Sequence, residues 1–209
     1  MAEREPVVGV LALQGDVEEH LAALRRAGAD ARAVKTREQL DALDGLVIPG
    51  GESTTVMKLL QRFGMDAPII DRVQSGMPLW GTCMGMIVAA RDVADIRQPT
   101  LGVLDVTVRR NAFGRQNESV EIDLDVPALG PGAFPAVFIR APWIERIGDE
   151  VELLASRDGH GVMVRQANVL ATSFHPELTG DSRVHAYFLS MVERARAARK
   201  KIGKRSTAA

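Results

Sequence analysis

The sequence contains very little cysteine: Cys83 is the only one among 209 residues, so no internal disulfide bond can form. A chain without disulfides is typical of the reducing cytoplasm. The lone cysteine and the four scattered histidines also lack the spacing of zinc ligands, and we expect no metal and no cofactor. Residues 1–6 lack the apolar stretch of a signal peptide, which again indicates a cytoplasmic location.

An excess of charge of one sign is also missing. The sequence has 26 Lys and Arg against 27 Asp and Glu, which gives no electrostatic reason to expect nucleic-acid binding. No apolar run approaches the length that spans a membrane, so we expect no membrane association. The hydrophobic content of 46% is ordinary for a globular protein, and 209 residues can bury the core of one large domain.

Apolar runs alternate with helical patterns in the first half of the chain. Strands are predicted over residues 7–13, 29–34, 43–48 and around 79–80, and helices over about 16–27, 54–62 and 84–90. Asp16 and Glu19 have the spacing of a capping box at the start of the first of these helices. Strand alternating with helix at this rhythm predicts an α/β fold with a doubly wound, mostly parallel sheet.

The middle of the chain has a different pattern. Residues 103–108 and 120–126 alternate apolar and polar side chains, which is typical of half-exposed antiparallel strands. Further strands are predicted over 134–139, 151–155 and 161–166, before the chain returns to the sheet over 169–174. A last helix is predicted over 182–198. We therefore expect one domain over residues 1–198 and a basic, disordered tail over residues 199–209.

Cys83 lies at the centre of residues 81–85 (Gly-Thr-Cys-Met-Gly), directly after an apolar strand. An isolated cysteine is more often a small buried hydrophobic residue. A strand that ends in a tight turn with a glycine on each side is instead typical of a nucleophile elbow. The glycines let neighbouring backbone pass close to the turn. The pattern therefore favours a reactive thiol.

A second polar segment, residues 174–177 (Phe-His-Pro-Glu), follows the predicted strand 169–174. Taken alone, His175 and Glu177 would be ordinary histidine and glutamate side chains. Residues two apart on an extended segment point to the same side, so Glu177 can orient the ring of His175. The other ring nitrogen could then take the proton of Cys83. The three residues form a candidate hydrolase triad.

Residues 49–53 (Pro-Gly-Gly-Glu-Ser) lie between a predicted strand and a helix. Such a loop could cradle a phosphate group, but no Walker lysine follows it, and a plain tight turn is a further alternative. With a nucleophile elbow elsewhere, an oxyanion hole becomes the favoured interpretation. The expected donors are the backbone N–H groups of Gly51 and Met84, the latter following the nucleophile.

These segments resemble those of class I (triad) glutamine amidotransferases and, within that class, the glutaminase subunits of pyridoxal 5′-phosphate synthases. The resemblance runs from residue 8 to the final helix. Its motifs are residues 9–16 (Gly-Val-Leu-Ala-Leu-Gln-Gly-Asp), 48–55 (Ile-Pro-Gly-Gly-Glu-Ser-Thr-Thr), 81–85, 110–116 (Arg-Asn-Ala-Phe-Gly-Arg-Gln), 138–142 (Phe-Ile-Arg-Ala-Pro) and 174–177. The elbow and the Phe-His-Pro-Glu segment indicate the class, and the other segments indicate the subfamily.

The resemblance implies a flavodoxin-like amidotransferase fold and hydrolysis of L-glutamine. It makes Cys83 the nucleophile, His175 the acid and base, and Glu177 the partner that orients His175. The implied glutamine site is formed by Gly51, Glu52, Ser53, Arg110, Ile139 and Arg140. The ends of glutamine are charged, and Arg110 or Arg140 could bind its carboxylate. Met84 departs from the subfamily, which usually has alanine after the nucleophile, so the packing of the elbow is in question.

The resemblance also implies a partner, because free ammonia would be lost to bulk water. That partner is a barrel-fold synthase subunit that makes pyridoxal 5′-phosphate, in a dodecameric core that carries one glutaminase per subunit. The residues Gln14, Gly15 and Asp16 are placed at the interface, where docking activates the glutaminase. The alternative for them is a simple strand-to-helix turn.

Three other functions remain open from the sequence. The chain could be the glutaminase of another pathway, such as imidazole glycerol phosphate synthase, although the subfamily motifs weigh against it. It could be a cysteine peptidase or chaperone on a similar sheet. It could also be a regulatory subunit with a silent triad, although all three triad residues are present.

Overall fold

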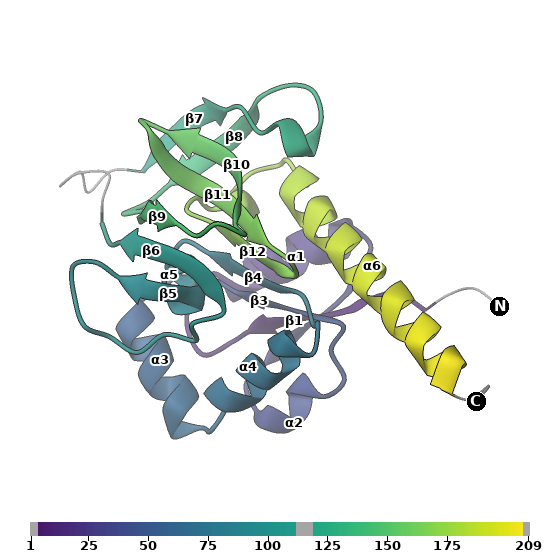
Figure 1. Cartoon of the computed structure of the whole chain (residues 1–209). Coiled ribbons are helices and arrows are strands. Elements are labelled where there is room, and N and C mark those ends of the chain that lie inside the picture. Colours follow the sequence, from purple (N-terminus) through teal and green to yellow (C-terminus); the bar gives the residue numbers. More distant parts are fainter. Residues whose placement is uncertain (1–3, 112–118, 207–209) are drawn as a thin grey trace.

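The structure is a computed structural model that describes residues 4–111 and 119–206, with only the backbone of residues 202–206 (Figure 1). Residues 112–116, which belong to one of the motifs above, lie outside the described residues. None of the described helices is both long enough and apolar enough to cross a membrane.

The first part of the chain builds the parallel half of a large sheet. Its strands follow the spatial order β2-β1-β3-β4-β12, and every neighbouring pair is parallel. The strands are β1 (Val7–Leu11), β2 (Asp30–Val34), β3 (Gly45–Ile48), β4 (Leu79–Thr82) and β12 (Val169–Thr172). Except at β2, every residue of these strands is buried, as expected for a sheet covered on both faces.

Helices cover the two faces of this half. The apolar side chains of α3, α4 and α5 pack in one cluster, and those of α1 and α6 pack in another. The helices are α1 (Val17–Arg26), α2 (Arg37–Leu40), α3 (Ser53–Arg62), α4 (Asp66–Gln74), α5 (Met84–Ala89) and α6 (Arg183–Ser206). The doubly wound α/β arrangement predicted from the sequence is confirmed (Figure 1).

The middle of the chain extends the same sheet with antiparallel strands. β12 pairs with β11, which pairs with β10 and β9, and β9 pairs with β6, all antiparallel. These strands are β6 (Leu104–Arg109), β9 (Trp143–Ile147), β10 (Glu152–Arg157) and β11 (His160–Gln166). At the end of the sheet, β5 (Ala90–Val93) pairs with β6 in parallel. Neither β5 nor β9 is predicted from the sequence, because each is a short run that contains two charged residues.

A separate two-stranded sheet is formed by β7 (Val120–Leu124) and β8 (Phe134–Phe138), joined through the 3-10 turn η1 (Pro127–Leu129). The inward side chains of this small sheet join the cluster that contains α1 and α6. The chain then returns through β12 to a second 3-10 turn, η2 (Pro176–Leu178), before α6. The predicted antiparallel excursion is therefore divided between two sheets.

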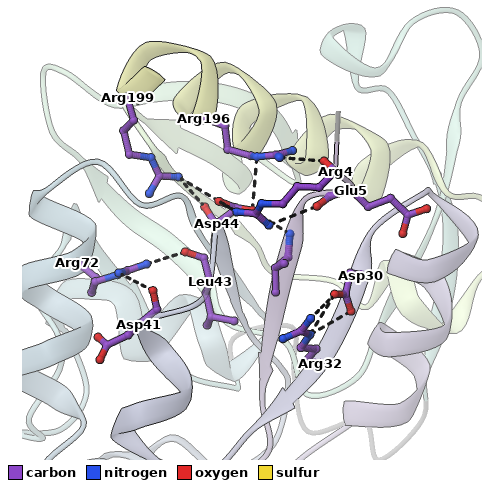
Figure 2. A network of polar contacts seen from close by, with 11 residues as sticks. Arg4, Glu5, Asp30, Arg32, Asp41, Leu43, Asp44, Arg72, Arg196 and Arg199 are labelled. Carbon is purple, nitrogen blue, oxygen red and sulfur yellow. Dashed lines mark hydrogen bonds and ion pairs between the residues drawn. The ribbon is translucent and has the colours of Figure 1, made fainter. Parts of the chain in front are cut away.

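The C-terminal helix is longer than predicted. The sequence predicts a helix over 182–198 and a disordered tail from residue 199, but α6 continues to Ser206. Figure 2 shows the reason: Arg196 and Arg199 reach from α6 to Asp44, just before β3. Arg196 also donates a hydrogen bond to the carbonyl oxygen of Arg4. These contacts dock the end of the helix on the amino-terminal edge of the sheet, opposite the edge where the loops after β3 and β4 lie.

Candidate active site

The predicted elbow is present between β4 and α5. Cys83 has a positive φ of 48° with a ψ of −107°, a conformation that a residue other than glycine adopts only under strain. A Cβ on Gly81 would lie 2.3 Å from the carbonyl oxygen of Gly85, and one on Gly85 would lie 2.0 Å from that of Ile48. Both flanking glycines are therefore sterically required. The N–H of Cys83 donates to Thr172 of β12 at 2.7 Å, which ties the elbow to the neighbouring strand.

His175 follows β12 and starts the turn η2. Its Nδ1 lies 2.7 Å from Oε1 of Glu177, and both side chains are buried. The predicted contact is therefore found, although the segment is a 3-10 turn and not the extended chain that we expected. Cys83 is close enough to the His175 ring to help raise the pKa of the imidazole. The thiol itself is 8% exposed and lies 3.8 Å from the carbonyl oxygen of Ile139. Thiol, imidazole and carboxylate thus form one connected series.

Electrostatics favour a charged imidazole in this series. Burial opposes the charge on His175, but hydrogen bonds with Asp16, Cys83 and Glu177 outweigh it and raise the pKa of the imidazole to about 12. Burial also raises the pKa of the Glu177 carboxyl, which the hydrogen bond from His175 counters only in part. The two groups thus compete for one proton. Because two carboxylates face Nδ1 of the ring, we assign that proton to His175.

The carboxylate of Asp16 occupies a position that the sequence does not predict. The predicted capping box is wrong: the Asp16 side chain accepts no hydrogen bond from the N–H groups at the start of α1. Its Oδ2 lies instead 3.5 Å from Nδ1 of His175, and the hydrogen bond with His175 lowers the pKa of the Asp16 carboxyl. Its side chain is 42% exposed. The attraction of a nearby imidazolium is the physical reason why this carboxylate leaves the helix end.

A cavity of about 330 Å³ opens at Cys83 and His175. Every residue predicted to bind glutamine contributes to its wall, as do Gly15 and Asp16. The wall comprises Gly15, Asp16, Gly51, Glu52, Ser53, Cys83, Met84, Ile87, Arg110, Asn111, Ile139, Arg140, Pro142 and His175. Glu177 lies behind His175, away from the cavity. Gln14 is also outside the wall, where its Oε1 accepts a hydrogen bond from the N–H of Glu52 at 3.4 Å.

The two predicted oxyanion donors come from the loop after β3 and from the start of α5, and both line the cavity. Gly51 has a φ of 147°, and a Cβ there would lie 3.5 Å from Cε of Met84. Met84 is the first residue of α5, where a backbone N–H has no partner within the helix. Its side chain is 2% exposed and packs in the core cluster of α3 and α5. The elbow therefore accommodates a large residue after the nucleophile by burying it.

Glu52 uses its side chain to cap α3. Its carboxylate oxygens accept hydrogen bonds from the N–H groups of Thr54 and Thr55 at 3.1 and 2.7 Å. Burial opposes ionisation, but these hydrogen bonds dominate and lower the pKa of Glu52 to about 2. A capping role was not predicted, and it leaves the carboxylate ionised at the edge of the cavity.

Arg110 is held by Gln98, a residue that is not predicted from the sequence. Oε1 of Gln98, in the loop after β5, accepts hydrogen bonds from Ser53 and Thr54 at 3.2 Å and from Nη1 of Arg110 at 3.3 Å. Nη1 also donates to the Thr54 hydroxyl at 3.4 Å. The guanidinium group is thus fixed against the start of α3. A lone glutamine in a loop carries no recognisable sequence signal.

Arg140 is the exposed cation of the cavity wall. Its φ is 44°, in the left-handed region that non-glycine residues rarely adopt. Such strain is typical of functional sites. Arg110 and Arg140 are the arginines of the wall, so both predicted carboxylate-binding candidates face the same space as Cys83.

Two buried histidines were also missed. His20 of α1 and His185 of α6 are both fully buried, and Nε2 of His20 lies 3.3 Å from Oε2 of Glu177. Among the described residues, Asp16, His175 and Glu177 also offer ligand atoms that could hold a metal ion, all within 4.8 Å of one another. The hydrogen bonds between them already account for their proximity.

Comparison with known proteins relates this site to a family. The model of the SNO glutamine amidotransferase family matches residues 10–194. A Streptomyces avermitilis protein named Pyridoxal 5'-phosphate synthase subunit PdxT is 60% identical over 189 residues, which cover 90% of this chain and 94% of the relative. A protein of the same name from Mycobacteroides abscessus is 57% identical, covering 90% of this chain and 97% of the relative. A solved structure titled "Crystal structure of glutamine amidotransferase" is similar with a TM-score of 0.84 and 51% identity, covering 89% of this chain and 98% of that one.

Proposed function

Because this chain belongs to the SNO glutamine amidotransferase family, we propose that it hydrolyses L-glutamine as the glutaminase subunit of a pyridoxal 5′-phosphate synthase. Its products are L-glutamate and ammonia, and the ammonia passes to a partner synthase subunit. The observation that carries this proposal is that Cys83 and His175 line one cavity while Nδ1 of His175 lies 2.7 Å from Oε1 of the buried Glu177. A cytoplasmic location suits a thiolate nucleophile, which a reducing compartment protects.

The first half of the reaction acylates Cys83. The thiolate attacks the side-chain carbonyl carbon of glutamine, and the carbonyl electron pair moves to the oxygen. The N–H groups of Gly51 and Met84 donate hydrogen bonds to that oxyanion. The imidazolium of His175 gives a proton to the amide nitrogen as the C–N bond breaks. Ammonia leaves, and the glutamyl group remains on sulfur as a thioester.

The second half releases glutamate. Neutral His175 takes a proton from water, whose oxygen attacks the thioester carbon. Collapse of this second tetrahedral intermediate breaks the C–S bond and returns the thiolate beside a protonated His175. Glu177 stabilises the imidazolium in both halves, since its Oε1 lies 2.7 Å from Nδ1.

The other residues of the cavity wall bind the substrate. The α-carboxylate of glutamine binds Arg110, because that guanidinium is fixed by Gln98 and Thr54 while still lining the cavity. The ionised Glu52 faces the α-ammonium group. Backbone atoms of Ser53, Ile139 and Arg140 complete the site.

The partner is a barrel-fold synthase subunit in a dodecameric core that carries one glutaminase per subunit. We place its interface at Gln14, Gly15 and Asp16. Gly15 and Asp16 line the cavity, and Oδ2 of Asp16 lies 3.5 Å from Nδ1 of His175, so a partner seated there would act on the catalytic histidine through Asp16. This position supports activation by docking.

The test is a glutaminase assay with and without the cognate synthase subunit and ribose 5-phosphate. We expect glutamate release that rises on addition of the synthase and disappears in Cys83→Ala, while that variant still binds the synthase. Cys83→Ser serves as the matched control for packing. Glutamate release by Cys83→Ala would refute the assignment of Cys83 as the nucleophile. A rate of glutamate release that does not change when the synthase is added would refute activation by docking.

A further inference from the structure

We propose that His20 is a positioning residue for the triad: a neutral imidazole that holds the far oxygen of Glu177 and thereby keeps the near oxygen on His175. This inference rests on the proposed glutaminase function and extends it by one residue. It starts from a buried ring on α1 that the mechanism above does not use. His20 is fully buried, and its Nε2 lies 3.3 Å from Oε2 of Glu177.

The contact between Nε2 of His20 and Oε2 of Glu177 is important because of the surroundings of this oxygen. Among the described residues, Oε2 is fully buried and has no hydrogen bond of good geometry. A buried carboxylate oxygen without compensation is strongly unfavourable. The ring nitrogen of His20 faces it, while Oε1 is engaged by His175 at 2.7 Å. Glu177 is therefore held between two imidazoles, one on each oxygen.

The contacts of His20 assign its tautomer. Burial is the main reason why the pKa of His20 lies well below its usual value, and electrostatic interactions with His185 and His175 lower it further, so the ring is neutral. Nε2 lies between Oε2 of Glu177 at 3.3 Å and the Thr82 hydroxyl at 3.1 Å. A lone pair on Nε2 would face the carboxylate and be repelled. The proton of the neutral ring therefore sits on Nε2.

His185 of α6 supports the same tautomer. Its Nε2 lies 3.3 Å from Nδ1 of His20, and its own Nδ1 is buried without a partner among the described residues. If His20 carries its proton on Nε2, Nδ1 is an acceptor, and His185 donates to it from Nε2. The unpartnered Nδ1 of His185 is then a lone pair, which is less costly to bury than an N–H. Every ring nitrogen in this pair thus has a consistent role.

Neighbouring groups hold the His20 ring in place. Trp80 of β4 packs edge-on against both rings, with centroid distances of 5.4 Å to His20 and 4.9 Å to His185. Its own N–H is used by the hydroxyl of Thr172 at 3.2 Å. The hydroxyl of Thr82, on the same strand, lies 3.1 Å from Nε2 of His20, so the Nε2 proton is shared between this hydroxyl and Oε2 of Glu177. The ring is thus held by α1, β4 and α6 while it holds Glu177.

Two substitutions of similar polarity test the role. His20→Gln places an amide N–H near the position of Nε2 and keeps a donor for Glu177. His20→Asn places its amide near Nδ1 and loses that donor. We expect His20→Asn to lower kcat by about tenfold or more with KM unchanged, since a hydrogen bond to a charged group is worth at least about one tenfold step. His20→Gln should keep most of the wild-type kcat.

A pH profile separates positioning from folding. Loss of the donor raises the pKa of the Glu177 carboxyl, so the acid limb of kcat/KM should move to higher pH in His20→Asn and not in His20→Gln. Because Cys83 is the only cysteine, the rate of iodoacetamide alkylation against pH reports the same change in the isolated chain. Equal loss of activity in both variants with unmoved pH profiles would overturn the proposal, as would wild-type behaviour of His20→Asn.

The wild-type chain supplies a test that needs no variant. It has only four histidines, so a ¹⁵N-histidine NMR spectrum can be assigned. We expect His20 to stay neutral at pH 6 with its proton on Nε2, and a proton on Nδ1 or a charged ring would overturn the proposal. Wild-type and Cys83→Ala glutaminase rates are measured alongside. An inactive wild type with the expected NMR result would count against the proposed function and leave the tautomer of His20 standing.

Discussion

Substitution of Gly50 by alanine should damage catalysis while leaving the fold intact. A Cβ at Gly50 would lie 2.6 Å from Cε1 of His175 and 3.3 Å from Oδ2 of Asp16. Ordinary contact begins at 3.4 Å, so the imidazole must retreat from 2.6 Å to 3.4 Å, about 0.8 Å. The backbone of Gly50 does not have the positive φ that would strain alanine. The added methyl group therefore acts on the ring and not on the turn.

The size of the effect follows from the geometry. His175 is held by Glu177 at 2.7 Å, and a ring displaced by most of an ångström stretches or breaks that hydrogen bond. Misplacement of a catalytic group by about 1 Å costs on the order of 10²-fold in rate. We therefore expect Gly50→Ala to lower kcat about 100-fold. Its stability should be unchanged or slightly higher, because alanine restricts the unfolded chain more than glycine does.

The assay is steady-state glutamate release in the presence of the synthase subunit, with thermal unfolding measured on the same preparations. Gly180→Ala is the matched control, since a Cβ there meets nothing within 4 Å and the residue lies shortly after Glu177 in the chain. A Gly50→Ala variant with normal kcat would show that the His175 ring tolerates the displacement. The claim that its position limits the rate would then be wrong.

Three further expectations come from other parts of the molecule. Gln98→Leu frees the Arg110 guanidinium and should raise the KM for glutamine more than it changes kcat, as initial-rate kinetics can measure. Asp44→Ala leaves the buried Arg196 without its carboxylate and should lower the free energy of unfolding in urea by about 3 kcal/mol (Figure 2). Burial lowers the pKa of His185 to about 4, so the folded chain binds fewer protons than the unfolded one between pH 4 and 6.5. Stability should fall as the pH drops through that range, by up to about 1.4 kcal/mol per pH unit, and His185→Leu should flatten the fall.

The triad could be predicted from the sequence because each of its segments has a local signature. The elbow needs glycines on both sides of Cys83, since a Cβ on either would collide with backbone. The strand before His175 is a continuous apolar run, and Glu177 is only two residues away. Strand alternating with helix then predicts the parallel sheet that brings these segments to one edge. Local patterns and the fold class they predict are sufficient for this part of the site.

Contacts that join distant segments left no such signature. Asp16 has the spacing of a helix cap, yet its carboxylate turns to His175, which lies 159 residues later in the sequence. The basic residues after 198 have the composition of a free tail, yet Arg199 reaches Asp44 and the helix continues. In both cases a charge partner far along the chain overrides the local preference, and only the folded structure identifies that partner.

The two halves of the sheet divide the chemistry between them. The loops after β1, β3, β4 and β12 carry Asp16, Gly51, Cys83 and His175, and these are neighbouring parallel strands whose carboxyl ends meet at one edge. Arg110 and Arg140 come instead from the ends of β6 and β8, in the antiparallel part of the chain. The groups proposed to hydrolyse the amide therefore depend on the parallel core, and the arginines proposed to bind the substrate depend on the added strands. Changes in β6 or β8 should accordingly alter which amide is bound before they alter the attack of Cys83 upon it.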